Sequence, residues 1–246
     1  MRVYEYLADR KEEMPQWLRE YEPGQRVDFT KVLSSRVVYY PGSGDDGQGI
    51  RTFNEAEYAH VFFHADYGIT KADARDMLSK ENALRGYRLL DLQEVKESEL
   101  TPRGWRPHVR PQRTSFHNDM PALIDEKPYC LFAVYEKKEG SDVRGAQRFA
   151  VIQLFADGIA SYDALFANRN ARIDVLILQD HGFGGNYDRF GRGGLMDEIA
   201  RKSGVYPKYV CCEYEQNVWD GYALVEGVEP EIGGMHGNQR RLFVRR

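Results

Sequence analysis

The stretch that most constrains the fold is residues 172–194, where an apolar run passes directly into a glycine-rich loop. Asp180 and His181 stand at the junction between the two. In open α/β sheets, ligands bind in the crevice at the carboxyl ends of the strands. The sequence therefore predicts a site just after this run. The run itself predicts a strand that is buried on both faces, through Ile173, Val175, Leu176, Ile177 and Leu178.

Three other predicted strands end in the same way, with aspartate and glycine close behind. Residues 37–40 precede PGSGDDG, residues 61–63 precede HADYG, and residues 151–155 precede ADGIASY. Glycine allows positive φ and close backbone approach, and aspartate supplies a carboxylate or a helix cap. Such residues are common in ordinary turns, but four similar turns together favour a shared site. We expect one cleft to bring together Asp46, Asp66, Asp157, Asp180 and His181.

The first two of these turns favour a nucleoside-type cofactor. In dinucleotide-binding units, a glycine loop after the first strand passes the cofactor, and an acid after the second binds a ribose hydroxyl. The spacing is similar here, although Pro41 replaces the first glycine and the third glycine is missing. The pattern thus favours S-adenosylmethionine or another nucleoside-type ligand over a dinucleotide. The predicted cofactor-binding residues are Gly42, Ser43, Gly44, Asp46, Asp66 and Asp157.

Asp180 and His181 are the predicted catalytic residues. The imidazole can act as a general base, as a metal ligand, or as a structural group that bonds the loop backbone. His64 and Asp66 lie two apart on a predicted strand and therefore face the same side. These four side chains offer ligands for a divalent metal. Because no His-x-x-x-His or Cys-x-x-Cys pattern accompanies them, a metal is the less favoured alternative and none is assigned.

Residues 101–118 form a basic arm or loop with four arginines, three prolines and no acid. Its arginines can pair with phosphates, and its aromatic residues can stack on bases. The arm is interpreted as a solvated loop, as a nucleic-acid contact, or as a lid over an anionic ligand. The net charge of −4 favours the lid over nucleic acid. The predicted substrate-binding residues are Arg106, Arg110 and Asn186, and the predicted partner is a small anionic or nucleoside-containing ligand.

The bulk properties indicate a protein of the reducing cytoplasm. No run approaches the roughly 18 apolar residues of a membrane span, and the first residues carry charges where a signal peptide needs an apolar core. Three cysteines, two of them adjacent at Cys211 and Cys212, are too few for a disulfide framework. We expect reduced cysteines that pack in the core, and no membrane partner.

The stretches YYPGSGDD, HADYG, ADGIASYDALF and QDHGFGGN, together with residues 219–222, resemble a family of uncharacterised bacterial proteins. The resemblance covers most of the chain from Val37 onward. It implies a bacterial origin and a single domain, and it transfers no catalytic role. The class I methyltransferases are similar in strand order and in the first loop, which is an analogy of fold alone.

The predicted fold is a three-layer α/β domain over residues 1–246, with a Rossmann-like, mostly parallel sheet. A charged turn at 136–148 makes an antiparallel hairpin that is taken as an insertion. The alternative is an α+β arrangement in which this hairpin belongs to the main sheet. The predicted function is a methyltransferase-like bacterial enzyme that binds a nucleoside-type cofactor or nucleotide. The alternatives are a metal-assisted hydrolase or nucleotide-processing enzyme, and a non-catalytic ligand- or partner-binding protein.

Overall fold

A computed structural model describes residues 1–10, 13–40, 59–64, 71–80, 84–95, 129–143, 145–155, 172–177, 200–201, 203–212, 221–233 and 238–246. Its helices are α1 (Val3–Ala8), α2 (Gln16–Arg19), α3 (Phe29–Ser34) and α5 (Lys71–Ser79). Its strands are β1 (Val37–Tyr40), β2 (Ala59–His64), β3 (Tyr87–Val95), β4 (Tyr129–Lys137), β5 (Arg148–Phe155), β6 (Ile173–Ile177), β7 (Tyr209–Cys212), β8 (Tyr222–Leu224), β9 (Glu231–Gly233) and β10 (Asn238–Arg245).

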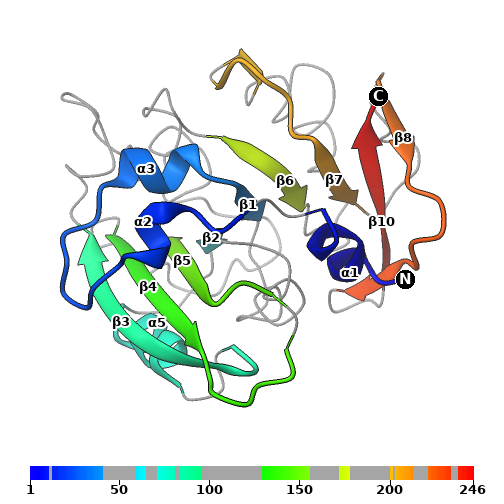
Figure 1. Cartoon of the computed structure of the whole chain (residues 1–246). Helices are drawn as coiled ribbons and strands as arrows, with labels where there is room; N and C mark the ends of the chain where they lie inside the picture. Colours follow the sequence, from blue (N-terminus) through cyan, green and yellow to red (C-terminus); the bar gives the residue numbers. More distant parts are fainter. Residues whose placement is uncertain are drawn as a thin grey trace, which may run out of the picture.

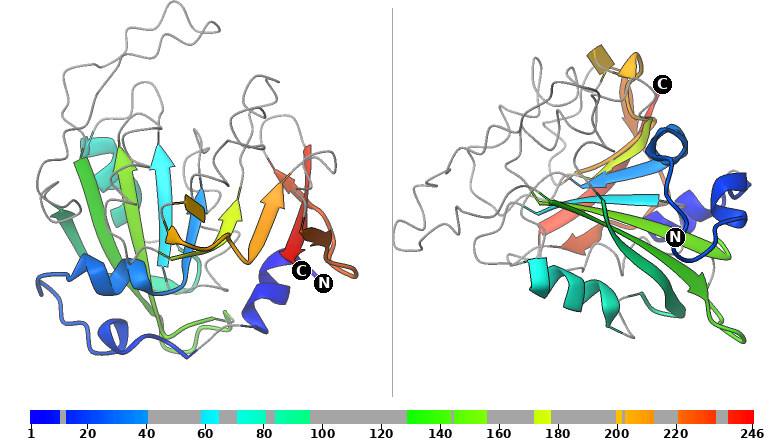
Figure 2. Two further views of the ribbon diagram at one scale, coloured as in Figure 1. Left: turned by 90° about the horizontal axis from the view of Figure 1, so that it is seen from above. Right: turned by 90° about the vertical axis from the view of Figure 1, so that its left-hand side faces the viewer.

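These strands form one mixed sheet (Figure 1). Its order is β3-β4-β5-β2-β1-β6-β7-β10-β8, and β9 also pairs with β10. The five central strands, from β5 to β7, pair in parallel. Every pairing toward the two flanks is antiparallel. Figure 2 shows the arrowheads of the central strands directed toward the same edge of the sheet.

The predicted three-layer, Rossmann-like, mostly parallel α/β fold is wrong. The described residues are predominantly β, and their four helices span only four to nine residues. Five of their nine strand pairings are antiparallel. The predicted hairpin is part of the main sheet, because β5 pairs with β4 on one side and with β2 on the other. An apolar run has the same pattern whether its strand pairs in parallel or antiparallel. The sequence therefore did not distinguish the two directions of pairing.

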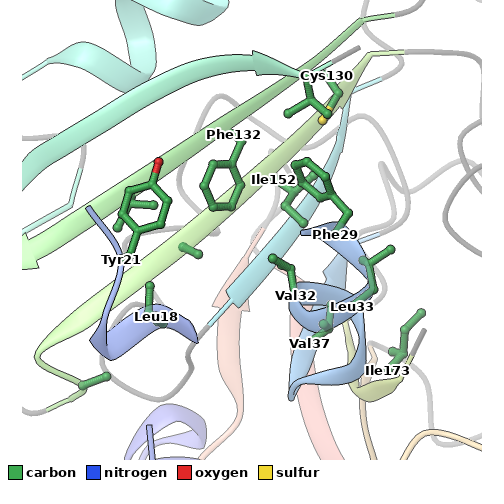
Figure 3. Close-up of a cluster of buried hydrophobic side chains, with 14 of the residues drawn as sticks. Leu18, Tyr21, Phe29, Val32, Leu33, Val37, Cys130, Phe132, Ile152 and Ile173 are labelled. Atoms are coloured by element: carbon green, nitrogen blue, oxygen red, sulfur yellow. The ribbon is translucent and has the colours of Figure 1, made fainter. Parts of the chain in front are cut away.

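Helices cover both faces of the sheet. Asp28 caps α3 by accepting a hydrogen bond from the Thr30 amide (3.1 Å), and α2 and α3 pack on the face shown in Figure 3. The other face receives α1 and α5, whose buried residues are spaced four apart and so share one side of each helix. The helical core residues are Leu18, Phe29, Val32 and Leu33 on the first face, and Val3, Leu7, Ala74 and Leu78 on the second.

Asp91 on β3 holds the segment between α2 and α3 against the sheet through hydrogen bonds. Its Oδ2 accepts hydrogen bonds from the Tyr21 hydroxyl (2.6 Å), the backbone amide of Gly24 (2.7 Å) and the side-chain Nε2 of Gln93 (2.7 Å). Burial pushes the pKa of Asp91 upward, but these hydrogen bonds outweigh burial and hold its pKa below the ordinary value. Asp91 therefore stabilises the folded protein as a carboxylate.

We expect Asp91→Ala to lower the free energy of unfolding by about 2 kcal/mol at neutral pH, since the lost hydrogen bonds involve a charge but are partly exposed. A group with a lowered folded pKa contributes above its unfolded pKa, about 3.9 for Asp, and loses that contribution as the pH falls through its folded pKa. Urea unfolding at several pH values should show the two proteins converging in acid. The exposed Asp142 serves as control, and a difference that is constant with pH would contradict the account.

The three cysteines are buried, and none forms a disulfide. Burial raises the pKa of the Cys130 thiol, which suits the predicted role of the cysteines as packing residues. In the part of the chain that the structure describes, no helix is long and apolar enough to cross a membrane. The cytoplasmic location stays a prediction.

Candidate functional site

The carboxyl ends of the five parallel strands meet along one edge of the sheet, here called the carboxyl edge (Figure 2). The register aligns these ends closely. His64 of β2 lies opposite Phe155 of β5, and Ile177 of β6 lies opposite Cys211 of β7. The four stretches of aspartate and glycine found in the sequence follow β1, β2, β5 and β6. All four therefore begin at this edge.

β1 stands at the topological switch point of the parallel strands. It pairs with β2 on one side and with β6 on the other. The chain builds outward from β1 to β2, and after β5 it returns across β1 to form β6. In sheets of this kind the crevice for a ligand opens where the strand order reverses. The strand order therefore favours the ends of β1 and β6, at Tyr40 and Ile177, as the position of a ligand crevice.

The site residues predicted from the sequence all lie outside the described residues. The structure places the strand ends that precede them, and not their side chains. Among the described residues, no group of three or more His, Cys, Asp or Glu could hold a metal ion. The residues concerned are Gly42, Ser43, Gly44, Asp46, Asp66, Arg106, Arg110, Asp157, Asp180, His181 and Asn186.

The predicted basic arm at 101–118 also lies outside the described residues, but β3 and β4, the strands before and after it in the chain, reach the carboxyl edge. Val95, which ends β3, lies opposite Cys130. Tyr129, which begins β4, lies opposite Phe155 at the end of β5. The strand before residues 96–128 therefore ends, and the strand after them begins, at the edge where the parallel strands end.

A cluster of charges lies near the end of β3, where α5 begins; we call it the basic corner. It consists of Lys71, Arg75 and Glu94. The Lys71 ammonium pairs with Glu94 Oε1, and Arg75 approaches Glu94 Oε2 at 3.4 Å. The hydrogen bond from Lys71, opposed by some burial, holds the pKa of Glu94 below its ordinary value. Two cations thus share one carboxylate, and all three side chains are more than a third exposed.

Gln153 is a candidate residue that the sequence analysis missed. It lies on β5, two residues before the end of the strand, and is only 4% exposed. Its carboxamide oxygen is buried and has no hydrogen-bond partner among the described residues. Buried polar groups are nearly always hydrogen-bonded, so this acceptor is a strong exception. The sequence feature that could have identified Gln153 is its position as the one polar residue inside the run FAVIQLF.

A second missed feature lies at the opposite edge of the sheet, beneath the switch point. Asp174 occupies a bulge in β6, because Val37 pairs with Ile173 while Val38 pairs with Val175. Its Oδ2 lies 2.9 Å from Nε of Arg36, and these two side chains are 10% and 2% exposed. This buried ion pair joins β6 to the residue that precedes β1. It therefore helps to hold β6 against β1, the strand at the switch point.

No family model, curated protein or solved structure matches the chain. The resemblance to uncharacterised bacterial proteins thus stays a prediction. What is known of the site comes from the sheet and its described side chains.

Proposed function

We propose that the protein binds a small anionic ligand at the carboxyl edge, beside the ends of β1 and β6. The observation that carries the proposal is the parallel register, which brings the ends of five strands to one edge and sets a switch point among them. Four glycine- and aspartate-containing stretches start there, so a ligand would meet backbone amides and carboxylates together.

The charge of the ligand is inferred from the basic residues at this edge. The basic corner contributes two cations against one carboxylate, and the strands before and after the arginine-rich residues 101–118 end and begin at this edge. Positive charge on a local surface raises the concentration of anions there, even in a chain whose formal charge is −4. The proposed ligands include anions that contain a nucleoside. The prediction of a methyltransferase-like enzyme is not kept, because it depended on the Rossmann-like fold.

Thermal melts with AMP, S-adenosylmethionine, inorganic phosphate and magnesium chloride test this function. A ligand at a hundred times its Kd stabilises the folded state by about 2.7 kcal/mol, which for this chain length corresponds to roughly 5–10 °C in Tm. We expect AMP to produce such a shift and magnesium alone to produce none. The absence of a shift with every anionic probe would overturn the proposal.

A pair of charge variants tests whether the basic corner contributes. Combined Lys71→Gln and Arg75→Gln should reduce the shift produced by AMP, and added salt should reduce the wild-type shift as well. Lys80→Gln is the matched control, since Lys80 is an exposed cation just beyond the other end of α5 and pairs with Asp76 at 3.0 Å. An equal effect of the control would show that general charge, rather than this corner, is responsible.

A further inference from the structure

We propose that Gln153 is a ligand-binding residue of the site at the carboxyl edge, where its carboxamide oxygen accepts a hydrogen bond from an N–H or O–H group of the ligand. This inference rests on the proposed function and deepens it. It adds a neutral donor group to the anionic group that the ligand must carry.

Gln153 lies close to the carboxyl edge, between two paired strands. It lies opposite Phe62 of β2 on one side and Leu131 of β4 on the other. β2 is in turn the neighbour of β1, so Gln153 lies two strands from the switch point and two residues below the edge. A ligand that enters between the ends of these strands would meet this position along the sheet.

Gln153 lies on the same face of the sheet as Phe149 and Val151. Residues of a strand alternate between its two faces, and Phe149 and Val151, four and two positions earlier, belong to the core covered by α1 and α5. α5 packs on β3 and β4, and the ring of Tyr6 in α1 packs on Tyr209 of β7. Gln153 therefore belongs to the face of the sheet that carries α1 and α5, at the end of β5 nearer the carboxyl edge.

The buried carboxamide of Gln153 lowers the stability of the fold. A buried acceptor without a partner destabilises the fold, whereas an apolar side chain of similar shape would not. If Gln153 served only to fill space in the core, replacing it by an apolar side chain of similar shape would raise the stability of the fold. Retention of a destabilising polar group next to a binding site is expected when that group acts on a ligand.

Gln153→Met, which keeps most of the side-chain volume, separates the two roles. Without ligand, the variant should melt about 2–4 °C above the wild type, because the unpaired acceptor is removed. With AMP as the probe, its Kd should rise roughly tenfold, because the hydrogen bond is lost. Gln147→Met is the matched control, an exposed glutamine just before β5, and it should change neither value.

The outcomes are distinguishable. A lower Tm for Gln153→Met would show that the carboxamide supports the fold, and would overturn the inference without touching the proposed function. A higher Tm with an unchanged Kd for AMP would also overturn the inference alone. If the wild type binds no anionic probe at all, the proposed function fails, and this inference fails with it.

Discussion

Asp174→Ala is expected to lower the free energy of unfolding by about 3–5 kcal/mol, because it leaves the Arg36 guanidinium buried near the amino end of β1 without its carboxylate. For a chain of this length the Tm should fall by roughly 6–20 °C. Arg172 lies 3.6 Å from the other oxygen of Asp174 but is much more exposed, so it retains its hydration when the carboxylate is removed. The loss should therefore come mainly from Arg36.

The double variant Arg36→Met with Asp174→Leu is the informative partner of that experiment. Replacing a buried ion pair by apolar residues of similar volume is often neutral or stabilising, whereas removing one partner is costly. The double variant should therefore recover most of the stability lost in Asp174→Ala, as measured by urea unfolding. A loss below about 1 kcal/mol in the single variant would contradict the burial and pairing described for Asp174.

Phe132→Ala should produce a loss of similar size, about 3–5 kcal/mol, because it removes a fully buried ring from the centre of β4. This ring meets Tyr21 and Phe29 edge-on, with centroid separations of 6.0 and 5.6 Å. It is the point at which the segment carrying α2 and α3 packs on the sheet (Figure 3). Its removal should therefore loosen that segment as well as the strand.

Leu224→Ala is the control for the ring deletion, since Leu224 on the flanking strand β8 is 43% exposed. Surface substitutions of this kind usually stay within about 0.5 kcal/mol. Guanidinium unfolding of the three proteins compares them directly. Equal losses in Phe132→Ala and Leu224→Ala would show that Phe132 is not the centre of the core.

The strands were largely predictable, because apolar runs of five to nine residues signal them directly. The alternation of apolar and polar residues over 87–95 predicts a strand, and β3 has these bounds. The pairing directions were not predictable, since β5 shows one apolar pattern although it pairs antiparallel with β4 and parallel with β2. That ambiguity produced the wrong fold class.

The missed elements have local explanations. α1 has the sequence VYEYLA, whose valine and tyrosines favour a strand over a helix. Packing of Val3 and Leu7 against the sheet made this segment helical instead. β10 carries three arginines among eight residues, and no strand was predicted there. Its pairing with β7, β8 and β9 places it inside the sheet.

The strands that precede the predicted site residues were predictable, but the polar side chains described on these strands were not. The turns after β1, β2, β5 and β6 could be found from glycine and aspartate, and the register brings the strands before them to one edge. Gln153 and Asp174 were overlooked because each interrupts an apolar run by a single residue. Their roles depend on neighbours that are distant in sequence, such as Arg36 for Asp174, and local patterns carry no such information.

The most direct test of the central claim is hydrogen exchange measured by mass spectrometry, with and without AMP. If the ligand binds at the carboxyl edge, exchange should slow in peptides that contain the ends of β2, β5 and β6, at His64, Phe155 and Ile177. Peptides from α2 and β8 should be unchanged. Slower exchange confined to α2 and β8, with none at the three strand ends, would contradict the account.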